Sequence, residues 1–154
     1  MFRHIVVLAD RHPASVHAAR HAYELTRALG GRVTLLHVLE GNTSRDREAA
    51  EQHVKALSVG ARRPPHEVIL PLGNHDVRHK IATFAAQHQV DLIVIGLSGD
   101  GSLLDEALGR LGVSLTQVSG VPVHLAGCAG GFGAPRSSRW NQVAETASVR
   151  QKTL

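Results

Sequence analysis

The sequence is poor in cysteine and in aromatic residues. Its 154 residues include one cysteine, Cys128, which excludes a disulfide within the chain and a cysteine-based zinc cluster. The aromatic residues are Phe2, Tyr23, Phe84, Phe132 and Trp140. The core must therefore be aliphatic, and the chain lacks the aromatic platform on which single-stranded nucleic acids stack.

Long apolar runs are also missing. No stretch approaches the roughly 20 apolar residues that a membrane-spanning helix needs. The N-terminal residues Met1–His4 lead at once into a strand-like run, without the apolar region of a cleavable signal. We therefore expect a cytoplasmic protein that does not contact a membrane.

The excess of basic over acidic residues is concentrated at the C-terminal end. The whole chain carries a formal charge of +4 and has a pI near 10.0. Residues 127–154 hold four basic residues and one acidic residue, whereas residues 1–126 hold 13 basic and 12 acidic residues. Nucleic acid is therefore not an expected partner of the first 126 residues. The glycine-rich, basic composition of residues 127–154 predicts a flexible tail.

Short aliphatic runs alternate with helical patterns along residues 1–126. The sequence predicts strands at 5–9, 33–39, 67–72, 91–96 and 121–126, with helices over 14–29, from about 44 to Gly60, after Asn74 or Asp76, and along the leucine stripe 104–118. This alternation predicts a parallel sheet with right-handed crossovers and helices on both faces. We expect one doubly wound α/β domain with a five-stranded parallel sheet and about four helices.

A glycine-rich loop, Gly96–Ser102, ends the fourth predicted strand, and nine residues separate Gly99 from Gly109. Ligands of open α/β sheets bind at the carboxyl ends of strands, and glycine lets backbone N–H groups approach a phosphate. If a helix begins at Gly109, its free N–H groups add further donors. The loop is therefore either a phosphate cradle or a set of turn glycines.

Several nucleotide-binding and catalytic motifs are missing from the sequence. It has no Gly-x-x-x-x-Gly-Lys-Ser/Thr loop, no Gly-x-Gly-x-x-Gly after the first strand and no Gly-x-Ser-x-Gly elbow. No pair of a nucleophile and a base stands out. We therefore expect no catalytic residues and no enzymatic activity beyond slow, incidental ATP hydrolysis.

The 11 histidines raise the question of a metal site. His17 and His21, like His75 and His79, have the i, i+4 spacing that can bind a divalent metal, but neither pair has an evident third ligand. Partly exposed histidines beside an apolar stripe explain the first pair equally well, and we assign no metal site. His37 is expected to be a hydrogen-bonded core residue.

The segments IVVLAD, VTLLHV and DLIVIGLSGDGSLLDEALG, together with Pro122-Val123, resemble the universal stress protein family over residues 1–126. Many members carry Gly-x-x-Gly, nine residues and then Gly-Ser or Gly-Thr, and those members bind ATP. Here Gly96, Gly99 and Gly109 stand at the glycine positions. The resemblance implies a homodimer joined through the fifth strand, Val121–Ala126, and a role in stress survival or in regulating partner proteins.

The resemblance also implies a set of cofactor-binding residues. Asp10 and Val38 would lie near adenine and ribose, and Ile95 and Gly96 would flank the nucleoside. The phosphates of ATP, with Mg²⁺, would meet Gly99 and the segment Gly109, Arg110 and Leu111.

Arg110 stands where the ATP-binding motif has Ser or Thr, and Asp100 and Asp105 add negative charge near the expected phosphates. An arginine can bind phosphate bidentately or simply project into solvent. Two hypotheses therefore stay open. The chain is a regulatory protein that binds ATP or AMP through this loop, or it is a nucleotide-independent dimeric interaction module whose protein partner is unknown.

Overall fold

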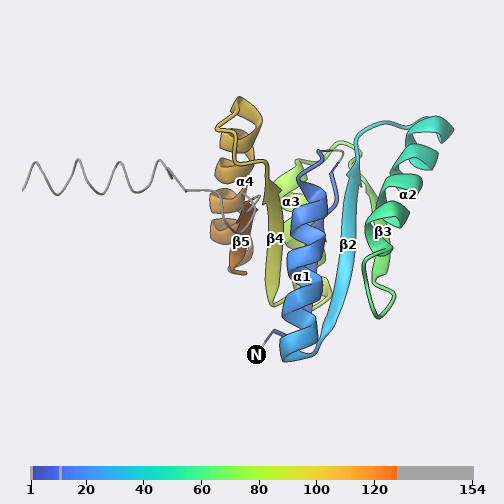
Figure 1. Cartoon of the computed structure of the whole chain (residues 1–154). Coiled ribbons are helices and arrows are strands. Elements are labelled where there is room, and N and C mark those ends of the chain that lie inside the picture. The colour runs from blue at the N-terminus through green and yellow to red at the C-terminus, as the bar shows by residue number, and fades with distance from the viewer. Residues whose placement is uncertain (1, 11, 128–154) are drawn as a thin grey trace, which may run out of the picture.

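The computed structural model describes residues 2–10 and 12–127, and the tail predicted over 127–154 lies almost entirely outside them. Strands and helices alternate along the described chain (Figure 1). The elements are β1 (His4–Leu8), α1 (Ser15–Leu29), β2 (Arg32–Leu39), α2 (Ser44–Ser58), β3 (His66–Pro71), α3 (Val77–Gln87), β4 (Leu92–Leu97), α4 (Leu103–Ser119) and β5 (Val123–Gly127).

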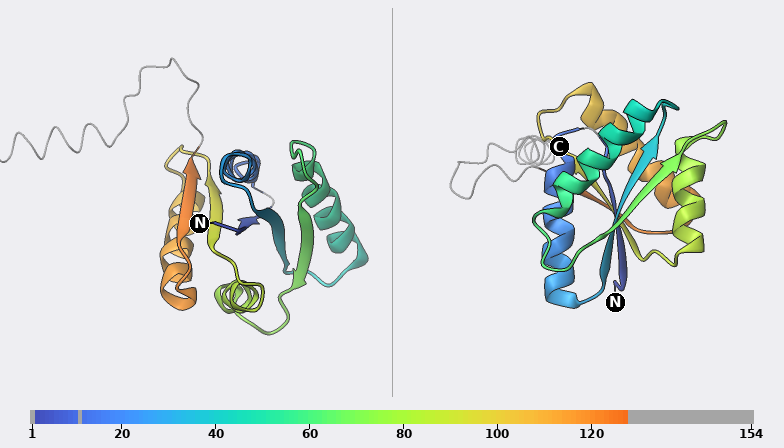
Figure 2. Two further views of the ribbon diagram at one scale, coloured as in Figure 1. Left: turned by 90° about the horizontal axis from the view of Figure 1, so that it is seen from below. Right: turned by 90° about the vertical axis from the view of Figure 1, so that its right-hand side faces the viewer.

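The five strands form one parallel sheet with the order β3-β2-β1-β4-β5. The chain first winds outward from β1 to β3 and then returns to add β4 and β5 on the other side of β1. Figure 2 shows α1 and α2 on one face of the sheet and α3 and α4 on the other. The predicted doubly wound α/β fold is confirmed.

The core is aliphatic and lies in two layers, one on each face of the sheet. Every residue of β1 is buried, as are the first five residues of β4. Odd-numbered residues of β1 pack with α1 and α2, whereas Val6 and Leu8 pack with the other layer, which contains Ile81 and Phe84 of α3. Strands buried on both faces require the continuous apolar runs that the sequence has here.

Polar side chains cap the starts of α2, α3 and α4, whereas α1 follows Ala14 without a side-chain cap. Thr43 caps α2 and forms a capping box with Asp46, and the Asp76 side chain accepts a hydrogen bond from the N–H of Arg78 at the start of α3. Of the two predicted caps for α3, Asn74 and Asp76, the structure uses Asp76.

At the end of the domain, the start of β5 differs from the sequence prediction, whereas α4 agrees within one residue with the helix predicted along 104–118. β5 begins at Val123, two residues later than expected, and the carbonyl of Pro122 accepts a hydrogen bond from Ile93 just before the strand. α4 begins at Leu103 and runs unbroken through Gly109. Among residues 2–10 and 12–127, no helix has the length and apolarity needed to cross a membrane.

Two histidines connect elements that are distant in the sequence. His4 is 4% exposed, and its ring contacts the Thr34 hydroxyl at 2.7 Å and the His88 carbonyl at 2.9 Å. Burial lowers the pKa of His4, and the nearby Arg32 lowers it further. Burial also lowers the pKa of His124, whose ring stacks on His21 of α1 at 4.5 Å between centroids. Both rings therefore favour the neutral form in the folded protein.

We expect the protein to lose stability when the pH falls below 6.5, the ordinary pKa of histidine. In this range the unfolded chain binds protons that the folded protein resists, so the free energy of unfolding decreases with falling pH. Urea unfolding at about pH 7.5 and about pH 5.5 measures the change. His4→Gln, which cannot be protonated, should show a smaller change than the unsubstituted chain; an equal change would contradict the assignment to His4.

Candidate nucleotide site at the carboxyl end of the sheet

The reversal of strand order lies between β1 and β4, and the residues that follow these two strands meet at the carboxyl end of the sheet. Asp10 follows β1, and the loop from Ser98 to Ser102 connects β4 to α4. This is the place where open α/β sheets bind ligands. The fold therefore brings the predicted nucleoside and phosphate segments to one edge.

Gly96 has a packing role within β4. A Cβ at this position would overlap the carbonyl group of Ala14 and lie 3.1 Å from the nitrogen of Ser15, because the start of α1 crosses directly over the strand. The glycine is thus required by the contact between helix and sheet. Its presence in the sequence does not by itself indicate a phosphate site.

Gly99 and Gly101 adopt left-handed backbone conformations, with φ of 79° and 70°. These turns direct the N–H groups of Ser98 and Gly99 toward the carboxylate of Asp105, at 2.8 and 2.7 Å. The Ser98 hydroxyl also lies 2.9 Å from this carboxylate. Successive N–H groups that converge on one anion form a nest. The loop is therefore an anion site that is occupied by an anion of the same chain.

Asp105, the anion in this nest, belongs to the first turn of α4. It is 8% exposed, and its own N–H donates to the hydroxyl of Ser102, the residue that caps the helix. The Ser102-x-x-Asp105 pattern is typical of a helix start, and it could have located the beginning of α4 from the sequence. The sequence alone indicates Asp105 only as a negative charge near the expected phosphates, not as the group that fills the nest.

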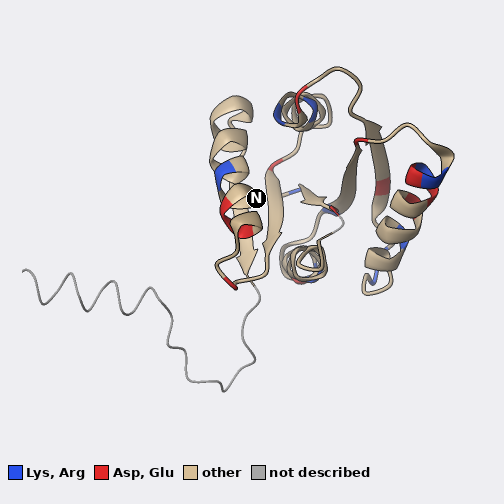
Figure 3. Ribbon diagram, turned by 90° about the horizontal axis from the view of Figure 1, so that it is seen from above, with Lys and Arg blue, Asp and Glu red and all other residues tan. Residues whose placement is uncertain are grey.

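A second carboxylate shapes the same loop. Asp100 accepts a hydrogen bond from the N–H of Ser102 at 2.9 Å and lies 2.8 Å from the Ser98 hydroxyl. The hydrogen bond from Ser102, with those from the serine hydroxyls, lowers the pKa of Asp100 to about 2. Figure 3 shows acidic positions in this loop and in the first turns of α4. The loop is therefore negatively charged at neutral pH.

The expectation that a helix begins at Gly109 is wrong. Gly109, Arg110 and Leu111 lie inside α4, and Arg110 is roughly 10 Å along the helix axis from its first residue. N–H groups inside a helix are already bonded to carbonyls of the preceding turn. Arg110 is exposed and lies 3.7 Å from Glu106 on the helix surface. In this structure the third glycine therefore adds no free donors to the cradle.

The nucleoside end of the predicted site is also engaged within the chain. Asp10 is half-buried, and its carboxylate accepts hydrogen bonds from the N–H of His12 at 3.0 Å and from the Ser15 hydroxyl at 2.6 Å. These contacts form the turn that leads into α1. Arg11, which stands between Asp10 and His12 in the sequence, lies outside the described residues.

Val38, predicted near adenine and ribose, and Ile95, predicted to flank the nucleoside, belong to the core layer beneath α3 and α4. Ile95 is 1% exposed and packs in one cluster with Leu108 and Leu115, and the partly buried Val38 packs against the same cluster. The neighbouring His37 points to the opposite face, where its Nδ1 contacts the carbonyl of Ala9. His37 is 7% exposed and is the hydrogen-bonded core histidine that the sequence predicts.

The histidine pairs form no metal centre in the described part of the chain. No group of three or more His, Cys, Asp or Glu side chains is positioned there to hold an ion. His21 is instead stacked on His124, and His79 lies 3.7 Å from the carboxylate of Asp76.

A model of the universal stress protein family matches residues 1–126. The chain belongs to the universal stress protein family. No curated protein matches the sequence in a direct comparison.

Solved structures with the same fold include other universal stress proteins. One, in complex with cAMP, has a TM-score of 0.58 and 18% identity over 81% of this chain and 96% of its own. Another, from Archaeoglobus fulgidus in complex with dAMP, has a TM-score of 0.62 and 20% identity over 81% and 97%. UspA from Lactobacillus plantarum has a TM-score of 0.61 and 19% identity, and the match covers 81% of this chain and 97% of UspA. These likenesses support the fold of this universal stress protein.

The anchoring of the loop by Asp105 leads to a stability prediction. Asp105→Ala should lower the free energy of unfolding by about 1–3 kcal/mol, because the N–H groups of Ser98 and Gly99 lose their buried acceptor. The matched control is Glu106→Ala, which removes an adjacent but exposed carboxylate and should cost less than about 0.5 kcal/mol. Urea unfolding at neutral pH compares the two variants, and equal losses would show that Asp105 does not anchor the loop.

Proposed function

We propose that this universal stress protein is a regulatory protein without catalytic activity that works without ATP bound in the loop after β4. The observation that supports the proposal is the position of the Asp105 carboxylate, which accepts hydrogen bonds from the N–H groups of Ser98 and Gly99 in the nest of the loop after β4. Of the two hypotheses raised by the sequence, this arrangement favours the nucleotide-independent interaction module.

Electrostatics supports this choice. Two unit negative charges about 4 Å apart repel by roughly 4 kcal/mol at the effective dielectric constant of a protein surface. A phosphate that enters the loop must therefore displace Asp105 or bring a cation that screens it. Asp100 and the exposed Glu106 add to the same unfavourable potential. Arg110, the nearest basic residue along α4, is oriented toward Glu106.

Equilibrium dialysis with labelled ATP and Mg²⁺ tests the proposal. We expect no saturable binding at this loop in the unsubstituted protein up to millimolar ATP, and measurable binding at the loop in Asp105→Ala, in which the nest is vacated. Binding at the loop is the part of any ATP binding that Gly99→Val abolishes. Glu106→Ala is the matched control and should behave like the unsubstituted protein. Micromolar binding of ATP to the unsubstituted protein that Gly99→Val abolishes would overturn the proposal.

Binding of an adenine nucleotide, ATP or AMP, is the second candidate function. Two facts favour it: the similar structures named above contain cAMP and dAMP, and the left-handed Gly99 already presents a preformed pair of N–H donors. Under this candidate, rotation of Asp105 out of the nest would open the site. Gly99→Val, which forces a branched side chain into a left-handed conformation, should then abolish the binding seen in dialysis.

The proposed module includes a homodimer formed through β5. This strand is an edge of the sheet, and an exposed edge invites pairing with another chain. Several large apolar side chains are exposed on β5 and α4: Leu103, Leu104, Val113, Val118 and Leu125. Exposed apolar side chains beside an unpaired edge strand are typical of an interface.

Leu125→Asp should dissociate the dimer, because the substitution buries a carboxylate among apolar side chains of the second copy. Sedimentation at tens of micromolar protein measures the change in mass. Val59→Asp places the same charge at an exposed apolar position after α2, away from β5, and should leave the mass unchanged. A monomeric unsubstituted protein under these conditions would contradict the dimer.

A further inference from the structure

A groove of about 720 Å³ runs along α1 and reaches the amino ends of β2 and β3. Its walls come from three segments: the exposed face of α1, the end of α2 with the loop before β3, and the turn from α1 into β2. The groove is therefore open at the other end of the sheet from the loop that contains Asp105. Its volume lies within the range of roughly 300–1,000 Å³ that is typical of small-ligand pockets.

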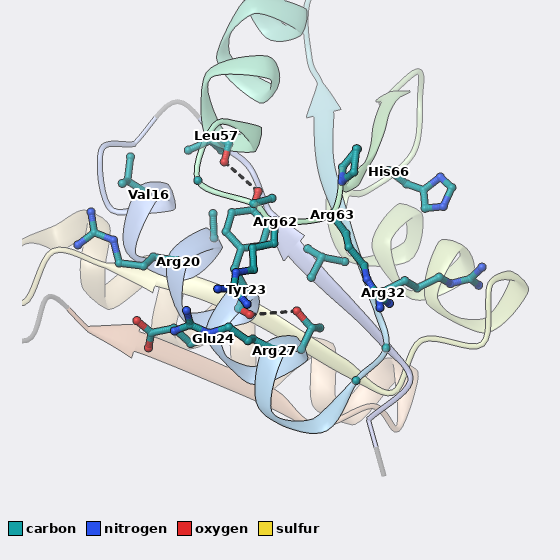
Figure 4. Close-up of a pocket in the computed structure, with 18 of the residues that line it drawn as sticks. Val16, Arg20, Tyr23, Glu24, Arg27, Arg32, Leu57, Arg62, Arg63 and His66 are labelled. Carbon is teal, nitrogen blue, oxygen red and sulfur yellow. Dashed lines mark hydrogen bonds between the residues drawn. The ribbon is translucent and has the colours of Figure 1, made fainter.

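The lining of the groove is strongly basic. Five arginines line it, against the single carboxylate of Glu24; they are Arg20, Arg27, Arg32, Arg62 and Arg63. In Figure 4, Arg20 and Arg63 lie on opposite sides of Tyr23. Within the described residues, only the guanidinium of Arg32 lies near another polar side chain, at 3.4 Å from Nδ1 of His4, and none of the five has an ion pair with a carboxylate. The guanidinium groups are thus available to a ligand.

Helix ends offset only part of this positive charge. α1 and α2 both end beside the groove, and each carboxyl-terminal helix end carries the equivalent of about half a negative charge. The two ends and Glu24 together offset roughly two of the five positive charges. Glu67, which lies close enough to raise the pKa of Tyr23, offsets about one more. A surplus of about two positive charges remains for a ligand.

One wall of the groove is rigid and apolar. The Tyr23 ring packs against the core layer of α1 and α2, and its hydroxyl donates to the Leu57 carbonyl at 2.8 Å. Burial, with a contribution from Glu67, raises the pKa of Tyr23 to about 12, so the phenol stays neutral and adds no negative charge. Ala19 and Leu57, both buried, complete this wall beside the arginines.

The charge of the groove limits what can occupy it. Residues 128–154 hold four basic residues and one acidic residue, so the chain's own C-terminal segment has the wrong sign. Arginine binds phosphate oxygens in a bidentate manner, and several arginines around one pocket suit a ligand with more than one phosphate. We propose that this groove binds a small molecule that carries two or more phosphate groups.

Isothermal titration of the full chain with inorganic tripolyphosphate at about 150 mM salt tests the proposal. We expect saturable binding, with inorganic monophosphate at least about tenfold weaker because it reaches fewer arginines. Arg62→Ser combined with Arg63→Ser should weaken tripolyphosphate binding by about tenfold or more. The matched control is Arg45→Ser combined with Arg47→Ser, which removes the same charge from the start of α2 and should change the affinity by less than about twofold.

Three results would overturn the proposal. The first is an equal loss of tripolyphosphate affinity in both double variants, which would indicate general electrostatic attraction. The second is the absence of saturable binding below millimolar tripolyphosphate. The third is displacement of tripolyphosphate by a short oligonucleotide at lower concentration, which would indicate a nucleic-acid surface. Circular dichroism of both double variants verifies that they are folded. Glu106→Ala removes an exposed carboxylate beside the loop after β4 and should leave tripolyphosphate affinity unchanged, whereas binding in that loop would become stronger. This comparison separates the groove from the loop.

Discussion

The close approach of α1 to β4 is the constraint around which the central part of this domain is built. Gly96 allows the backbone of Ala14 to lie directly over the strand, and a Cβ there would overlap it. The helix can then cover β1 and β4, whose apolar side chains are buried on both faces of the sheet. The same contact sets the position of the turn at Asp10 and of the loop that begins after Leu97.

The two ends of the sheet differ in charge for reasons that follow from this arrangement. At the carboxyl end, the loop after β4 folds back on the first turn of α4. There Asp105 accepts hydrogen bonds from the N–H groups that a phosphate would need. At the amino end, α1 and α2 terminate, and their carbonyl ends favour cations nearby. Arginines gather there in greater number than the helix ends can neutralise. The molecule thus has an anion site closed by its own carboxylate and a basic groove that is open.

The fold itself could be predicted almost completely from local sequence patterns. The run Leu92–Gly96 is continuously apolar because β4 is buried on both faces, and Thr43 and Asp76 mark helix starts through local hydrogen bonds. The boundary that failed, at Val123, lies where a nonlocal contact with β4 decides. The spacing of Gly96, Gly99 and Gly109 is the same whether a helix starts at the third glycine or runs through it.

The sequence alone determined the fold class, the aliphatic core and membership of residues 1–126 in the universal stress protein family, because these depend on periodicity and on short local motifs. Only the tertiary structure decided the roles of the glycines and of Asp105. A hydrogen bond between the N–H of Gly99 and a carboxylate six residues later depends on the angle at which the loop enters α4. The basic groove could not be predicted from the sequence either. Arg20 and Arg63 are far apart in the chain and line one groove only because α1 and the loop before β3 lie on the same face.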